Sequence, residues 1–117
     1  MKPYFYVYVL ELANGSYYTG FARDPLQRLA RHAAGRGSRL VRSFRPLELA
    51  GCWRVRGGRS EAMRVEAFIK SCPRETKQLL LREPFGLASR LRRATGLRLR
   101  PLPFLAAIDQ RRGVNVD

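Results

Sequence analysis

Cysteine, histidine, tryptophan and acidic residues are all scarce in this chain. Its 117 residues include two cysteines, one histidine and one tryptophan, and nine acidic residues stand against 23 lysines and arginines. Cys52 and Cys72 are too few and too far apart for a disulfide framework or a zinc site. We therefore interpret both as buried apolar residues of a protein in a reducing compartment.

Long apolar runs are also missing. No stretch approaches the roughly 20 residues that a membrane-spanning helix needs. Met1-Lys2-Pro3 leads into aromatic residues without the pattern of a signal peptide. These absences predict a cytoplasmic protein that is soluble and does not associate with a membrane.

What the chain has in excess is positive charge. The formal net charge is +14, and the sequence pI is about 11.3. So large a positive charge on a protein of this size predicts a polyanionic partner, with nucleic acid the leading candidate. Arginine far outnumbers lysine, and its planar guanidinium grips phosphate with two hydrogen bonds. The alternative is that the arginine excess reflects the base composition of the source genome.

A predicted β-hairpin opens the chain. Residues 4–10 are β-branched or aromatic and apolar on both faces, which predicts a strand buried on both sides. Asn14-Gly15 predicts a type I′ turn, so residues 17–20 would pair antiparallel with the first strand. Gly20 would end that strand and allow the backbone close to a ligand.

Three residues mark the start of a helix after this hairpin. Asp24 suits the N-cap, Pro25 the first helical position, and Gln27 the third, where it completes a capping box. Arg28 and His32 are four residues apart and therefore lie on one flank of the predicted helix.

These elements in this order resemble the GIY-YIG nuclease family, which is named for two short motifs on adjacent strands. Tyr6-Val7-Tyr8 stands where the first motif would be, and Tyr18-Thr19-Gly20 where the second would be. The resemblance covers about residues 4–83 and is closest to the small single-domain bacterial members. Other positions that match the family's pattern are Arg28, His32 and the helical Glu66.

The resemblance implies a divalent-metal-dependent endonuclease. Glu66 would hold Mg²⁺ or Mn²⁺, and Arg28 would hold the phosphate. Tyr8 is implied as the general base, with Tyr18 and His32 assisting at the water or with the proton. A free phenol has a pKa near ~10 and is a poor base at neutral pH, so we expect the Arg28 charge to favour the Tyr8 phenolate.

The chain departs from the family pattern at Tyr6, at Phe21 and in having no counterpart, after Glu66, of an asparagine that some members use. Simpler roles also stay open for several residues. Tyr6 replaces a glycine, and Phe21 replaces a lysine whose charge Arg23 is the candidate to supply. The tyrosines and His32 could equally be core residues. Glu66 could form a surface ion pair with Lys70, one turn further along the helix.

Arginine recurs every third residue in the loop after the first helix. Together with Arg23, these arginines are the predicted nucleic-acid-binding residues: Arg36, Arg39, Arg42 and Arg45. The alternative is a solvated loop without a ligand.

The whole pattern predicts an α/β (α+β) fold, with a small, mostly antiparallel three-stranded sheet flanked by about three helices. Further along the chain we expect a third strand over residues 47–55, a helix over 61–71 capped by Ser60, and another over 73–82. A nuclease domain would span residues 1–83, and residues 84–117 would form a basic C-terminal extension of unknown role.

The predicted function is hydrolysis of DNA phosphodiester bonds in repair or recombination. One compact domain has little surface for reading sequence, so we expect cleavage directed by structure, at branched, flapped or damaged DNA, or by a partner protein. Two alternatives are a non-catalytic nucleic-acid-binding module on the same scaffold and a basic protein that binds RNA.

Overall fold

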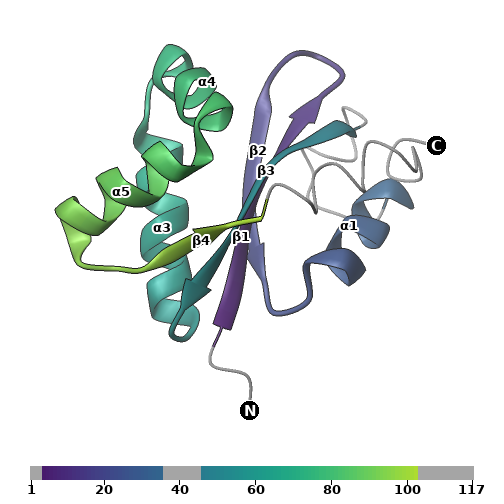
Figure 1. Ribbon diagram of the computed structural model, residues 1–117. Coiled ribbons are helices and arrows are strands. Elements are labelled where there is room, and N and C mark those ends of the chain that lie inside the picture. Colours follow the sequence, from purple (N-terminus) through teal and green to yellow (C-terminus); the bar gives the residue numbers. More distant parts are fainter. Residues whose placement is uncertain (1–3, 36–45, 103–117) are drawn as a thin grey trace.

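The computed structural model describes residues 4–35 and 46–102, and these form one antiparallel sheet with helices on both faces. The strand order is β2-β1-β3-β4, with bounds β1 (Tyr4–Leu12), β2 (Tyr17–Ala22), β3 (Pro46–Arg56) and β4 (Leu99–Pro101). Helix α1 (Pro25–Ala33) covers one face of the sheet. The other face carries α3 (Arg59–Ser71), α4 (Arg74–Arg82) and α5 (Pro84–Thr95) (Figure 1). The predicted α+β class is confirmed.

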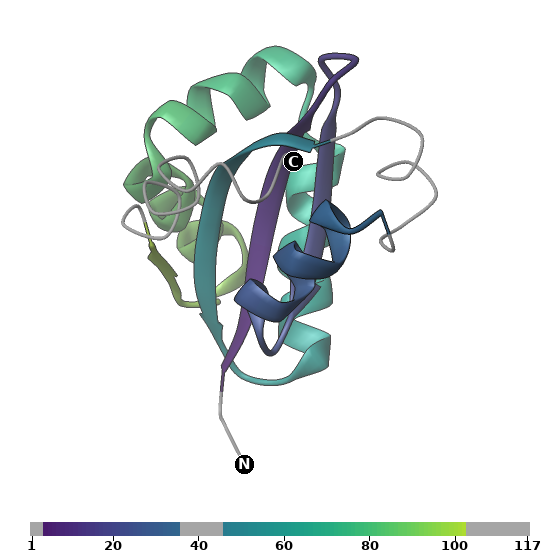
Figure 2. The ribbon, with the colours of Figure 1, turned by 90° about the vertical axis from the view of Figure 1, so that its right-hand side faces the viewer.

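Strand β1 is the centre of the core, because it is buried on both faces as predicted. Phe5, Val7 and Val9 pack on the side of α3, α4 and α5. Tyr8 and Leu10 pack on the side of α1. Figure 2, which is turned by 90°, shows α1 in front of the sheet and α3 behind it.

The hairpin between β1 and β2 is confirmed, but its turn is not the predicted type I′. That turn needs positive φ at both central residues, and in the described ranges only glycines have positive φ; Gly15 has φ +85°. The Gly15 N–H donates to the Leu12 carbonyl at 2.8 Å, and the Leu12 N–H donates to the Ser16 carbonyl at 2.9 Å. The backbone of Asn14 does not have positive φ, and its side-chain oxygen accepts a hydrogen bond from the Ser16 N–H at 3.1 Å.

Strand β3 contains an irregularity that reverses part of its side-chain alternation. Val9 pairs with Gly51 and Leu10 with Leu49, so Ala50 is an extra residue with no partner of its own. Leu49 consequently faces α1, whereas Trp53 faces the other helices. Regular alternation along the predicted strand 47–55 would place Leu49 and Trp53 on one face; this is wrong because the bulge shifts the two-residue period.

Helix α3 begins two residues earlier than predicted. Its N-cap is Gly58, not Ser60. Gly57 turns the chain with φ +126°, and Glu61 Oε1 accepts from the Gly58 N–H at 2.8 Å. This backbone hydrogen bond is the main reason why the pKa of Glu61 is lowered.

Two elements beyond residue 83, α5 and β4, belong to the same core as the hairpin. Leu87 and Leu91 of α5 are buried in the cluster that contains Trp53, and Trp53 Nε1 donates to the Pro84 carbonyl at 3.1 Å. Strand β4 pairs with β3 through Val55↔Leu99 and two further positions. The sheet therefore has one strand more than predicted, and α5 is an additional helix, among the described residues. No helix there is long and apolar enough to cross a membrane.

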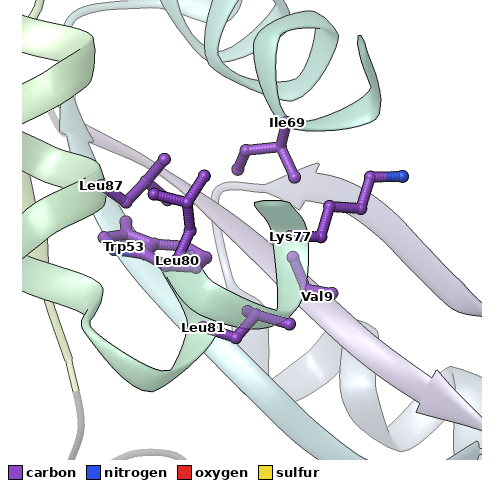
Figure 3. Close-up of a pocket in the computed structure, with 7 residues that line it drawn as sticks. All are labelled: Val9, Trp53, Ile69, Lys77, Leu80, Leu81 and Leu87. Carbon is purple, nitrogen blue, oxygen red and sulfur yellow. The ribbon is translucent and has the colours of Figure 1, made fainter. Parts of the chain in front are cut away.

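Packing of α4 and α5 on the sheet leaves a small apolar void of about 10 Å³ (Figure 3). Figure 3 shows the Lys77 amino group pointing away from the other labelled side chains. A void this small and without polar lining holds no ligand. The interior thus offers no binding site at this place.

Candidate active site at the edge strand β2

Tyr8 and Gly20 form the base of the candidate site. They are paired positions on β1 and β2, and β2 is one of the two edge strands of the sheet. A Cβ atom at Gly20 would lie only 2.7 Å from Tyr8 Oη and 3.1 Å from the Tyr18 ring. The Tyr8 ring therefore lies across Gly20 and reaches toward the edge. The strand continues to Ala22, so Gly20 accommodates a neighbouring side chain and does not end the strand as predicted.

Helix α1 adds His32 to these rings. Its start is confirmed, since the Asp24 side chain accepts from the Gln27 N–H at 3.1 Å. Tyr8 Oη lies 2.9 Å from Nε2 of His32, and this hydrogen bond is buried. The Tyr18 ring lies 5.3 Å from the His32 ring and 6.4 Å from the Tyr8 ring. Three of the predicted site residues thus form one aromatic cluster.

Tyr8 remains a neutral phenol in this environment. Burial is the main cause that raises its pKa above the ordinary value, and the charges of Tyr18 and Glu66 raise it further. Arg28 lowers it through its charge and a side-chain hydrogen bond. The expected effect of Arg28 is present, but burial outweighs it, so Tyr8 is no phenolate at neutral pH.

His32 is neutral as well. Burial, then the charges of Arg28 and Arg31, lower its pKa to about 4. Only 3% of the residue is exposed, and Nδ1 has no hydrogen-bond partner among the described residues. A neutral imidazole beside a phenol can accept a proton at pH 7.

Glu66 acts on this cluster from α3, on the other face of the sheet. Its side chain is 20% exposed, and Oε1 lies 3.7 Å from Nζ of Lys70. The ion pair with Lys70, which is the simpler alternative role of Glu66, is therefore present. The negative charge of Glu66 also raises the pKa of Tyr8. No group of three or more potential ligands forms within residues 4–35 and 46–102. Mg²⁺ commonly binds through one or two protein carboxylates and keeps several waters, so the single carboxylate of Glu66 fits this ion.

The arginines divide into two groups. Arg36, Arg39, Arg42 and Arg45 lie outside the described residues, and their role stays a prediction. Arg23 lines a hollow of about 350 Å³ beside the site, together with Arg28. Arg31 and Arg59 line it too, and the sequence analysis missed both. The i,i+3 spacing of Arg28 and Arg31 was the available signal, whereas Arg59 is brought there only by the tertiary fold.

The sequence of this chain is similar to that of known proteins of one family. The family model of the GIY-YIG catalytic domain matches residues 4–78. A UPF0213 protein from Halalkalibacterium halodurans is 38% identical over 76 residues, which are 65% of this chain and 80% of the relative. A UPF0213 protein from Haloquadratum walsbyi is 39% identical over 85 residues, 71% of this chain and 92% of the relative.

Some relatives are longer than the match. A UPF0213 protein from Aeromonas hydrophila is 38% identical over 81 residues, but these make up only 59% of its length. The solution NMR structure of a UPF0213 protein from Bacillus halodurans covers 75% of this chain and 96% of its own, with 34% identity and a TM-score of 0.42. On the family model and the sequence relatives, this chain belongs to the GIY-YIG catalytic domain family, a nuclease superfamily.

Proposed function

We propose that the chain is an endonuclease that hydrolyses DNA phosphodiester bonds with the help of Mg²⁺ or Mn²⁺, at branched, flapped or damaged sites. The supporting observation is the buried hydrogen bond of 2.9 Å between a neutral Tyr8 and a neutral His32. It lies where the family motifs bring strands and helix together. A targeting partner, a role in repair and a cytoplasmic location remain predictions.

Tyr8 and His32 together supply a path for one proton. In hydrolysis a water oxygen bonds to phosphorus and the water loses a proton. A neutral Tyr8 oxygen accepts that proton while its own proton passes to Nε2 of His32. This path requires that Nδ1 carries the ring proton beforehand, so His32 becomes an imidazolium. As the water oxygen bonds to phosphorus, the bond between phosphorus and the leaving oxygen breaks. The leaving oxygen takes a proton from solvent, and His32 later returns its proton through Tyr8 to solvent.

Arg28 links phosphate binding to this proton path. Its guanidinium acts on both Tyr8 and His32, and it lowers the pKa of His32. A phosphate held by Arg28 offsets that positive charge, which makes the imidazolium easier to form. Substrate binding would thus switch on the acceptor, and Arg28 would have both roles.

Glu66 on α3 is the residue that would hold the metal ion, on the face of the sheet opposite α1. When bound there, Mg²⁺ or Mn²⁺ would neutralise charge on the phosphoryl oxygens. Lys70 would then lose its ion-pair partner, a small cost since such surface pairs contribute at most about 1 kcal/mol.

The experiment is a nicking assay on plasmid and branched DNA, with Mg²⁺, Mn²⁺ or EDTA. We expect the wild type to cleave only with metal, Glu66→Gln to be inactive, and the control Glu75→Gln, on α4, to match the wild type. Mn²⁺ binding followed by electron paramagnetic resonance should weaken in Glu66→Gln alone. If the wild type binds both substrates without cleaving either, the non-catalytic binding module replaces the nuclease.

A further inference from the structure

A cationic hollow lies beside the candidate active site. It has a volume of about 350 Å³ and is bordered by the first turns of α1 and α3 and the end of β2. Its lining contains four arginines, and we call these the arginine groove: Arg23, Arg28, Arg31 and Arg59. Asp24 also lines the hollow, but its carboxylate accepts a backbone hydrogen bond as the N-cap of α1.

Aromatic rings hold two of these arginines in place. The Arg23 guanidinium lies 4.3 Å from the centre of the Phe5 ring, and that of Arg59 lies 5.4 Å from the Phe21 ring. The two rings are themselves in edge contact at 5.9 Å. A guanidinium stacked on a ring keeps its N–H donors at its rim, so stacking leaves Arg59 able to bind an anion. Because the stacking limits its motion, less entropy is lost on binding.

The backbone adds positive potential at the same place. Helices α1 and α3 both begin at the end of the sheet where β2 ends (Figure 1). The first turn of a helix carries partial positive charge. With four guanidiniums and one capping carboxylate, the groove is built to attract anions.

We infer that the arginine groove binds the phosphate backbone of duplex DNA next to the phosphate that is cut. This inference rests on the proposed function and extends it to the path of the substrate. Arg28 lines the groove and also acts on Tyr8, so a strand lying in the groove leads directly to the site. Arg31 and Arg59 are then positioning residues that bind a flanking phosphate and set the register of the strand.

The test measures DNA binding without metal, so that it does not depend on cleavage. A fluorescent duplex is titrated with the wild type, Arg31→Ala, Arg59→Ala and the double variant, at several salt concentrations. We expect each single variant to bind about 5- to 10-fold more weakly and to reduce the salt slope by about one. Arg90→Ala and Arg93→Ala on α5 are the matched controls and should change affinity by less than about twofold. Thermal melts followed by circular dichroism confirm that each variant folds.

Three outcomes would overturn the inference. If the groove variants bind DNA as well as the α5 controls do, the arginine groove has no role in DNA binding. The proposed nuclease activity would still stand, as long as the wild type cleaves. Tighter binding of a duplex RNA through the same arginines would overturn the assignment to DNA. A wild type that binds no DNA would overturn both proposals. Conversely, groove-dependent binding without any cleavage would support the groove and contradict the nuclease.

Discussion

At the scale of single residues, the contact between Tyr8 and Gly20 explains why a motif glycine stands on β2. Its φ is not positive, so backbone strain is not the reason. The reason is space, because any Cβ atom would meet the Tyr8 hydroxyl at 2.7 Å. The position of the proposed catalytic hydroxyl therefore depends on a residue that takes no part in the chemistry.

Gly20→Ala should separate activity from stability. We expect cleavage to fall about 10²-fold, since a displacement of the reacting group near 1 Å has that effect. Overpacking should lower the free energy of unfolding by only about 1–3 kcal/mol. The control is Gly86→Ala on α5, where the new atom meets nothing closer than 3.6 Å. Equal activity in both variants would show that the Tyr8 position is not critical.

His32 should make stability depend on pH in a defined window. Its pKa is about 4 in the fold against an ordinary 6.5, so the unfolded chain binds the proton first as the pH falls. The stabilisation is complete above pH 6.5 and is lost toward pH 4, at up to about 1.4 kcal/mol per pH unit. Urea unfolding between about pH 7 and pH 5 should show a shallower dependence in His32→Gln. Parallel curves for both proteins would mean that His32 is not buried in its neutral form.

Sequence patterns predicted which side chains lie together better than they predicted the protonation states of those side chains. The motifs and the spacing of Arg28 and His32 correctly predicted that Tyr8, Tyr18 and His32 meet. They did not predict a neutral Tyr8, because burial depends on the packing of α1 over the sheet. The roles of these residues remain predictions.

At the scale of elements, α5 is an integral part of the core although the sequence pattern weakens there. Leu91 is fully buried, so Leu91→Ala should lower the free energy of unfolding by about 2–5 kcal/mol. Leu79 on α4 is 53% exposed and serves as control, with an expected loss under about 1 kcal/mol. Denaturant unfolding measures both. If the two variants lose equal stability, α5 packs less firmly than the structure shows.

Local patterns identified the hairpin, α1 and α4 because their caps, turns and apolar periods lie within a few residues. They missed β4, which is three residues long and contains Pro101. A short strand with a proline at the edge has no period of its own and forms only because β3 offers free backbone groups. The bulge at Ala50 was equally hidden, since it arises from the pairing of two distant strands.

At the scale of the whole molecule, the fold gathers part of the positive charge at one place on the surface. The net charge of +14 predicted a polyanion, and the structure gathers part of that charge in the arginine groove beside Tyr8. Composition alone could not locate it, because the groove joins β2, α1 and α3. Family membership implies a nucleic-acid substrate, which fits this distribution.

In the proposed mechanism, the Tyr8 hydroxyl takes the proton from the attacking water during phosphodiester cleavage. The most direct measurement is the single-turnover cleavage rate of labelled branched DNA by wild type, Tyr8→Phe and Tyr17→Phe. Tyr17 is the control because it is on β2 and its ring lies against Arg74, outside the cluster. We predict a loss of about 10²- to 10⁴-fold for Tyr8→Phe and an unchanged rate for Tyr17→Phe. Cleavage by Tyr8→Phe at the wild-type rate would show that the Tyr8 hydroxyl does not accept the proton.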